Sequence, residues 1–306
     1  MEQLIKLDEY PVKKFLEALL QDKTTKKNII WATAIEKNGS TIDPRTEITK
    51  GDLIGYDPFE LQPRVYKSAE AQADRTKAKA EVFTPCWVVN KMNNHADFEW
   101  FGRESVFNTE NEQSWDITEG KIEFPEGKTW KDYVISHRLE ITCGEAPYLV
   151  SRYDTTTGEI IPVERRIGLL DRKLRVVGEN TETEEEWLEW AVKAFQASYG
   201  YEYQGDSLLI ARINLLITFV DYMNAKWGHN PTDAQLRKMV NIITWNIWQM
   251  DGLTGSVPFA KQVGDYEVQA LDLFGDAPEE EEEAQPCRIY DWTANKSVLY
   301  NGLKNT

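Results

Sequence analysis

The sequence has 306 residues, of which 51 are acidic and 35 are basic, so its formal net charge is −16 at neutral pH. Binding of duplex DNA needs a basic surface that displaces counterions from the phosphates, and this balance argues against a broad DNA-binding face on the chain itself. Hydrophobic residues make up 41% and aromatic residues 11%, which indicates a globular protein and not a disordered one.

The first part of the chain predicts one clear helix and several weaker elements. Apolar residues recur at helical spacing near the N-terminus, at Val12, Phe15, Leu16, Leu19 and Leu20. Residues 29–35 predict a strand that leads to a turn at Gly39. A polar, alanine-rich helix is expected over 64–80, a short helix over 86–95 and an irregular acidic insertion over 96–129.

The second part alternates strand and helix patterns. Residues 137–141 predict a strand, and Thr183 with the three glutamates after it forms a capping signature for a helix that Gly200 is expected to end. The segment 207–223 is apolar nearly all round, as in a helix buried against a sheet, and 236–243 predicts a further helix. This alternation predicts an α/β fold with a doubly wound, mostly parallel sheet.

Four regions are expected along the chain. Residues 1–63 predict a helical and strand-containing N-terminal extension, and 64–271 the main domain. An acidic linker with five consecutive glutamates covers 272–286, and a short strand-like tail covers 287–306.

Small and acidic residues follow the predicted strands at the points where those strands end. Gly144 and Ala146 come after the first strand, Glu202 ends a second and Asp251 a third, while Phe83-Thr84-Pro85 forms a turn ahead of them. Ligands of open α/β sheets bind outside the carboxyl ends of the strands, and a carboxylate there can bind a ribose diol. The spacing fits neither a G-x-G-x-x-G dinucleotide motif nor a phosphate-binding P-loop. The pattern predicts a cofactor cleft.

These segments, over roughly residues 64–300, resemble the class I (Rossmann-like) S-adenosylmethionine-dependent methyltransferases. More narrowly they resemble adenine-N6 DNA methyltransferases of restriction–modification systems, the branch labelled restriction endonuclease subunit M. The resemblance implies that the Phe-Thr-Pro element touches the methionine part of the cofactor, Glu202 its ribose and Asp251 its adenine. The full set of implied cofactor contacts is Phe83, Thr84, Pro85, Thr142, Gly144, Glu145, Ala146, Glu202 and Asp251.

The sequence departs from the family at its cofactor loop and at the catalytic motif. Glu140 stands where the family has aspartate, and Ala146 where it has glycine. The Asn/Asp-Pro-Pro-Tyr/Phe motif, which binds the target amine and stacks on the extruded base, is absent. The nearest strings begin at Asp57 and Asn230, and neither lies in a suitable context. No catalytic residue is therefore assigned, and we expect the chain to be inactive alone and to need a second polypeptide for catalysis and target recognition.

Contact with DNA is expected to come mainly through that partner. The densest basic stretch of the chain is the best candidate for a direct contact, with Arg165, Arg166, Arg172 and Lys173, beside the helix expected over 64–80. Two other functions stay open. One is a non-catalytic regulatory or decoy protein on a methyltransferase scaffold, and the other is methylation of RNA, protein or a small molecule.

The histidines and cysteines of the sequence are expected to have structural or surface roles and not catalytic ones. The three histidines are scattered and show no metal spacing. Cys86, Cys143 and Cys287 fit neither a disulfide framework nor a zinc motif, and a reducing cytoplasm is expected. The first residues lack the apolar core of a signal peptide, and no run approaches the roughly 18 apolar residues of a membrane helix, so no membrane contact is expected.

Overall fold

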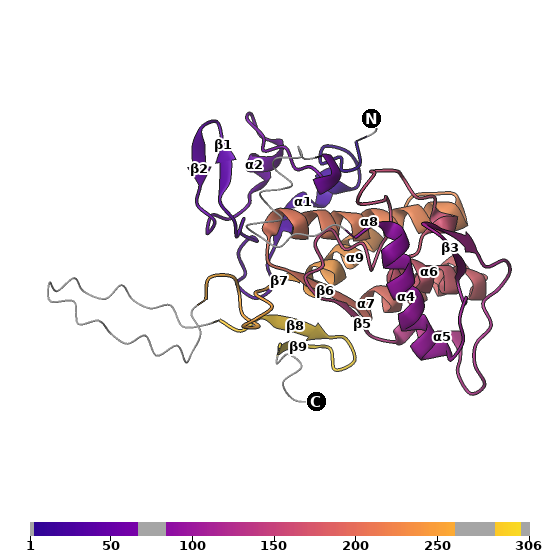
Figure 1. The fold of residues 1–306 in the computed structure, drawn as a ribbon. Coiled ribbons are helices and arrows are strands. Elements are labelled where there is room, and N and C mark those ends of the chain that lie inside the picture. The colour runs from indigo at the N-terminus through magenta and orange to yellow at the C-terminus, as the bar shows by residue number, and fades with distance from the viewer. Residues whose placement is uncertain (1–2, 67–83, 261–284, 301–306) are drawn as a thin grey trace, which may run out of the picture.

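A three-stranded parallel sheet lies at the centre of the computed structural model, which describes residues 3–66, 84–260 and 285–300. The strands β5 (Arg138–Glu140), β6 (Ser198–Glu202) and β7 (Ile247–Gln249) are ordered β5-β6-β7, so β6 is in the middle (Figure 1). The fold is therefore mixed α/β with a parallel sheet, as expected. Within the described residues, no strand extends this sheet to the larger doubly wound form.

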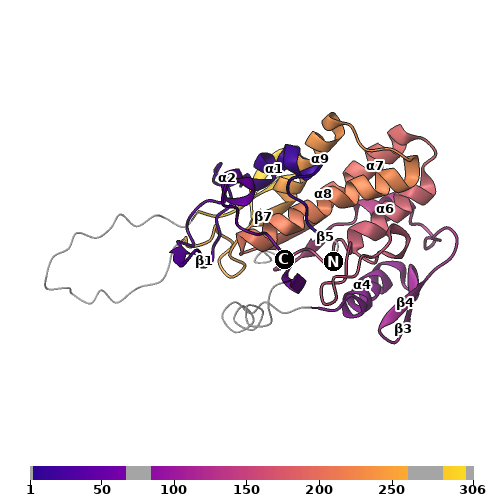
Figure 2. The same cartoon turned by 90° about the horizontal axis from the view of Figure 1, so that it is seen from above.

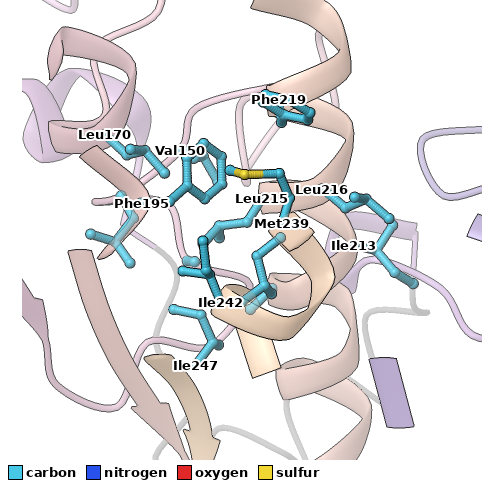
Figure 3. Packing of buried hydrophobic residues seen from close by; sticks show 14 of the residues in the cluster. Val150, Leu170, Phe195, Ile213, Leu215, Leu216, Phe219, Met239, Ile242 and Ile247 are labelled. Carbon is cyan, nitrogen blue, oxygen red and sulfur yellow. The ribbon is translucent and has the colours of Figure 1, made fainter. Parts of the chain in front are cut away.

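Helices from the second half of the chain pack together and against the sheet. They are α6 (Leu169–Asn180), α7 (Glu184–Gln196), α8 (Gly205–Trp227) and α9 (Asp233–Asn246). Their apolar residues meet in one core between the helices and the sheet, and Figure 3 shows Phe195, Phe219 and Ile247 among the members of this core. The sequence pattern predicted α7, α8 and α9, and the structure confirms them.

Two details of these elements are informative. Thr183 caps α7 through its side-chain oxygen, which accepts a hydrogen bond from the Glu186 N–H at 3.3 Å, as the sequence predicted. Gly200 does not end this helix, because α7 stops at Gln196 and Gly200 lies inside β6. A Cβ atom at Gly200 would sit 3.3 Å from the Cys143 side chain, so packing between strand and loop explains the glycine.

The helix α8 is long and apolar enough to pass a test for a membrane span, with a mean hydropathy of 1.3 in its most apolar window. In the structure 78% of that window is buried, and α8 crosses the middle of the molecule between the sheet and other helices (Figure 2). This is the environment of a core helix, in which a nearly all-round apolar surface is expected.

The N-terminal segment shares the core of the rest of the chain. It contains α1 (Val12–Leu20), the hairpin β1 (Ile35–Lys37) and β2 (Ser40–Ile42), and α2 (Lys50–Ile54). The apolar residues of α1 that the sequence singled out are all buried, and this helix packs on α8 and α9. The strand expected over 29–35 is wrong in extent, because only its last residue belongs to β1.

Two side chains fasten this segment to the sheet. The Arg212 guanidinium donates to the carbonyls of Leu19, Gln21 and Ile247, at 2.6, 3.0 and 2.8 Å. Gln249 pairs with both backbone groups of Ile30, accepting from its N–H at 2.9 Å and donating to its carbonyl at 2.8 Å. The side chain of Gln249 thus anchors the N-terminal segment to the end of β7.

The middle of the chain forms a smaller layer beside the sheet. Its elements are the 3₁₀ turn η1 (Arg64–Tyr66), α4 (Cys86–Phe101), the hairpin β3 (Asn108–Asn111) with β4 (Ser114–Ile117), α5 (Trp130–Ile135) and the 3₁₀ turn η2 (Val163–Arg165). The helix expected over 86–95 exists but extends to Phe101, and the expected insertion contains an antiparallel hairpin. The helix expected over 64–80 falls mostly on 67–83, outside the described residues.

A C-terminal hairpin covers part of the other face of the sheet. It is formed by β8 (Arg288–Asp291) and β9 (Lys296–Leu299), and Figure 1 shows it below the three parallel strands. Between hairpin and sheet remains a hollow of about 490 Å³ lined by Leu139, Tyr199, Trp248 and hairpin residues. The described part of the tail expected over 287–306 contains this hairpin, and most of the acidic linker lies outside the described residues.

Candidate functional site

A cavity of about 1020 Å³ opens where β5 and β6 end at their carboxyl termini. Its walls come from the loop after β5, the residues 202–204 after β6, the N-terminal stretch 32–34 and Phe259. This position is the usual ligand-binding edge of a parallel sheet. The volume is at the upper end of the range for small-molecule sites, roughly 300–1,000 Å³.

The loop after β5 has an unusual backbone. Thr142, Gly144 and Ala146 all have positive φ, at 47°, 53° and 64°, while Cys143 and Glu145 do not. Such values suit glycine, but for threonine and alanine they are uncommon and cost free energy. An alternating backbone of this kind directs N–H groups into a concavity that favours anions. Here the Gly144 N–H donates to a carboxylate oxygen of Glu202 at 2.8 Å.

Glu202 connects the two strand ends. One carboxylate oxygen accepts from Gly144, and the other from the N–H groups of Tyr203 and Gln204, at 2.9 and 3.0 Å. The residue is only 7% exposed and lines the cavity. Burial raises the pKa of Glu202, and the three backbone hydrogen bonds act in the opposite direction. The fixed carboxylate can accept further hydrogen bonds from a ligand in the cavity.

Glu140, the last residue of β5, holds the far end of the same loop. Its two oxygens accept from the N–H groups of Tyr148 and Leu149, at 3.2 and 3.0 Å. Burial raises the pKa of Glu140 to about 8; the two amides lower it and the nearby Glu202 raises it further. Glu140 therefore performs a positioning role, since it ties the loop back to the strand.

Glu145 joins the loop to more distant parts of the chain. Its carboxylate accepts from the Arg64 N–H at 2.7 Å and from the Tyr153 hydroxyl at 2.5 Å. Asn214 on α8 donates to the Glu145 carbonyl at 3.0 Å. Thr84 lines the cavity nearby, and its carbonyl accepts from the Thr155 hydroxyl at 3.0 Å. Residues from several elements thus fix this wall of the cavity.

The structure brings together most, but not all, of the predicted cofactor contacts. Five of them line the one cavity: Thr84, Thr142, Gly144, Glu145 and Glu202. Pro85 is the N-cap residue before α4 and is not part of the wall, and Ala146 in the loop is fully buried. Phe83 lies outside the described residues.

Asp251 also stands apart from the cavity wall. It closes a turn, in which its carboxylate accepts from the Leu253 N–H at 2.8 Å and its own N–H donates to the Ser256 carbonyl. It does act on the cavity indirectly. Burial raises the pKa of the wall residue Tyr203, and the charge of Asp251 raises it further.

Several wall residues were not predicted from the sequence. Ala32, Thr33 and Ala34 reach the cavity from the N-terminal segment, which was expected to be a separate extension. Tyr203 and Phe259 form an edge-to-face aromatic pair, with ring centroids 5.9 Å apart. Tyr203 follows Glu202 directly, so its proximity could have been inferred, whereas the path of the N-terminal segment has no local signal.

The predicted nucleic-acid contacts need correction. Arg172 is buried and paired with Asp97 at 2.6 Å, and Lys173 is buried with its ammonium group donating to the carbonyls of Ser136 and Ala197. These two side chains offer nothing to a phosphate, contrary to expectation, because they satisfy acceptors inside the protein. Arg166 pairs with Asp221 at 2.6 Å, while Arg165 is exposed.

The cavity has the groups for binding a polar ligand but no evident nucleophile. Cys143 beneath the loop is buried, and burial raises the pKa of its thiol well above the ordinary value, so it is not activated. Cys86, Cys143 and Cys287 are all free and buried. In the described ranges no group of histidine, cysteine and acidic side chains could hold a metal ion.

Comparison with known proteins gives no relative from which a function could be transferred. No family model, no curated protein and no solved structure matches the chain. A function therefore has to be argued from the residues of the cavity and their geometry.

Proposed function

We propose that the chain is the S-adenosylmethionine-binding part of an adenine-N6 DNA methyltransferase of the restriction–modification type. One observation carries the proposal. Thr84, the loop residues Thr142, Gly144 and Glu145, and Glu202 are far apart in the sequence, yet all line one cavity. Their position at the carboxyl ends of parallel strands is the place where α/β folds bind nucleotide-like ligands.

The chemistry of the cavity wall suits this cofactor. S-adenosylmethionine is a nucleoside that carries a cationic sulfonium and an amino acid group, and the wall presents the carboxyl groups of Glu140, Glu145 and Glu202. Glu202 is the candidate for the ribose hydroxyls, because its carboxylate is held in place by three amides. Tyr203 and Phe259 provide aromatic surface for the adenine.

Each group of the chain has a defined part in this proposal. The cofactor supplies an activated methyl group. Glu140 and Glu202 hold the loop after β5 in its strained conformation, so the cavity is formed before the ligand arrives. Because the loop is already ordered, binding energy is not needed to order it and can instead hold the cofactor in a fixed orientation.

DNA and the target adenine require a second polypeptide in the proposal. The chain has a net charge of −16, and Arg172 and Lys173 of its densest basic stretch are buried. A partner would supply the basic DNA-binding face, the target recognition and the missing amine-binding motif. Both polypeptides would act in a reducing cytoplasm, in keeping with the three free cysteines.

Calorimetric titration with S-adenosylmethionine tests the proposal. We expect a Kd in the micromolar range, which corresponds to about −8 kcal/mol. Glu202→Ala should weaken binding by about tenfold or more, because hydrogen bonds to a charged group contribute roughly 1.5–3 kcal/mol. Glu164→Ala, which removes an exposed carboxylate outside the cavity, is the matched control and should bind like the wild type. Absence of heat with the wild-type chain at millimolar cofactor would refute the cofactor assignment.

The alternative is a non-catalytic regulatory or decoy protein on a methyltransferase scaffold. The absence of an Asn-Pro-Pro-Tyr motif from the sequence favours it. The two functions differ in the need for the cofactor, since a decoy has no use for an intact cavity. Cofactor binding that depends on Glu202 therefore supports the enzyme, and methyl transfer to DNA by the purified chain alone would contradict the need for a partner.

A further inference from the structure

The hollow between the sheet and the C-terminal hairpin has mainly aromatic walls. Its volume is about 490 Å³, and it lies where the hairpin β8–β9 covers one face of the parallel strands (Figure 1). Five of the twelve residues that line it are tyrosine or tryptophan, against 11% aromatic residues in the whole chain: Tyr199, Trp248, Tyr290, Trp292 and Tyr300. Small-molecule sites have this apolar and aromatic character, with volumes of roughly 300–1,000 Å³.

Hydrogen bonds inside the protein fix the orientation of two of these rings. The Tyr290 hydroxyl donates to Oδ1 of Asn295 at 2.9 Å, and the Trp292 indole N–H donates to Oδ1 of Asn246 at 2.8 Å. Since the polar edges of both rings are engaged in this way, they offer a ligand mainly their faces. The face of an aromatic ring is the negative part of its quadrupole and attracts cations.

A carboxylate adds a negative charge to these walls. Asp291 lines the hollow, and its Oδ1 accepts from the N–H groups of Thr293 and Ala294, at 2.9 and 2.8 Å. Burial raises the pKa of the wall residue Tyr199 to about 12, and the charge of Asp291 acts in the same direction. The phenol therefore stays neutral, and the fixed carboxylate supplies the negative charge of the hollow.

The basic residues of the wall do not balance this charge. Side chains alternate along a strand, so the guanidinium of Arg138 is on the face opposite to Leu139, where it lies 3.5 Å from Asp97. The His137 ring packs edge-to-face on Tyr199, with centroids 5.7 Å apart. Histidine in general carries little charge at pH 8. Asp291 is then the charged group that the hollow presents to a ligand.

We propose that the hollow binds a small organic cation that carries a methylated ammonium group. Carbon surrounds the charge of such a group, so it fits apolar walls, whereas a bare ammonium or metal ion is strongly hydrated and loses its water there. The net charge of −16 also favours a cation over an anion. Among the described residues, the walls of the hollow and of the cavity at the strand ends share only Leu139, so this inference does not rest on the proposed function.

Calorimetric titration with choline at pH 8 tests the proposal. We expect saturable binding with a Kd of about 1 mM or tighter. The control ligand is 3,3-dimethylbutan-1-ol, which has the shape of choline but carbon in place of the charged nitrogen. It should bind at least about tenfold more weakly, because it lacks the attraction to the ring faces. No saturable heat with choline, or equal affinity for the uncharged ligand, would overturn the proposal.

Two substitutions of Trp292 test the part of the aromatic wall. Trp292→Phe and Trp292→Leu both lose the hydrogen bond to Asn246, but only phenylalanine keeps a ring. Any loosening of the hairpin that follows from this bond is therefore common to both variants. Trp292→Leu should bind choline at least about fivefold more weakly than Trp292→Phe. Equal dissociation constants for the two variants would show that the ring does not contact the cation.

An isosteric change at Asp291 tests the part of the charge. Asp291→Asn keeps an oxygen that can accept from Thr293 and Ala294, and it removes the negative charge. It should weaken choline binding by about fivefold or more without affecting the uncharged ligand. Asp116→Asn removes an exposed carboxylate from the other antiparallel hairpin, β3–β4, and should bind choline like the wild type. Equal choline affinities of the two asparagine variants would contradict the assigned role of Asp291.

Discussion

Two groups of buried charged side chains differ in what neutralises them. Between α4 and α6, the Arg172 guanidinium nitrogen Nη1 lies 2.6 Å from Oδ2 of Asp97, and the Tyr133 hydroxyl donates to the same carboxylate. At the cavity, Glu140 and Glu202 have no cation beside them in these hydrogen bonds and are held by backbone amides. The charges of the first group are paired with each other inside the protein, whereas the carboxyl groups of the second line the cavity.

The kind of partner therefore distinguishes a structural charged residue from a candidate binding residue better than the presence of a charge does. A buried ion pair with satisfied partners joins elements, and its charge is hidden from any ligand. A carboxyl group that is fixed by amides and lines a cavity keeps lone pairs available to a ligand. We therefore expect changes in the first group to act mainly on folding, and changes in the second to act on ligand binding or on pH dependence.

The largest effect is expected from Arg172→Met. This change removes one partner of a fully buried ion pair and leaves Asp97 without its closest cation. Breaking such pairs costs about 3–5 kcal/mol of unfolding free energy. Lys121→Met, at an exposed lysine, should cost less than about 0.5 kcal/mol. Urea denaturation measures the unfolding free energy of both variants. Equal losses of unfolding free energy would contradict the distinction between the buried ion pair and an exposed cation.

Two glycine substitutions compare the contact between α8 and the N-terminal segment with an uncrowded position in α6, through their effects on stability. A Cβ atom at Gly205 would lie 2.0 Å from the Ile30 carbonyl oxygen, so Gly205→Ala must displace backbone. We expect a loss of about 2–3 kcal/mol. At Gly178, inside α6, an added Cβ meets nothing within 4 Å, and Gly178→Ala should stabilise by about 0.5–1 kcal/mol. Thermal unfolding of the two variants should therefore shift in opposite directions.

Glu140→Gln tests the raised pKa of this cavity carboxyl group through the pH dependence of the unfolding free energy. The folded protein keeps a proton on Glu140 up to pH about 8, whereas the unfolded chain releases it near 4.5. The free energy of unfolding therefore falls as pH rises through this window. Glutamine has no proton to release, so the stability of the variant relative to the wild type should increase by at least about 1 kcal/mol between pH 5 and 8.5. Glu164→Gln, an exposed counterpart, should show no such trend in urea titrations.

The smallest effect is expected from Thr142→Gly in the cavity loop. Thr142 has a φ of 47°, which glycine adopts without steric cost. Relief of this strain is partly offset by the greater freedom of glycine in the unfolded chain, and we expect a net gain of about 0.5–1 kcal/mol. Ala197→Gly, at the helix end with negative φ, is a control that should not stabilise. A loss of stability in Thr142→Gly would show that the loop is not strained.

The sequence predicted the elements whose signals are local. The apolar period of α1, α7, α8 and α9 identified them, and the residues at strand ends, together with Thr84, identified five residues of the cavity wall. Two errors have a common cause in tertiary packing. The cluster that contains Arg172 and Lys173 looks like a basic surface, because nothing in a short window shows that acceptors from other elements surround it. The contribution of Ala32–Ala34 depends on Gln249, more than 200 residues away.

The pairing of Gln249 with Ile30 has a consequence for the walls of the cavity. The amide of this one side chain exchanges two hydrogen bonds with the backbone of Ile30, at 2.9 and 2.8 Å, and donates a further one to the Tyr203 carbonyl at 2.8 Å. Ala32, Thr33 and Ala34, just beyond Ile30, line the cavity, and so does Tyr203. A single amide at the end of β7 therefore couples two walls that lie more than 150 residues apart in the sequence, and a change at Gln249 would be transmitted to both of them.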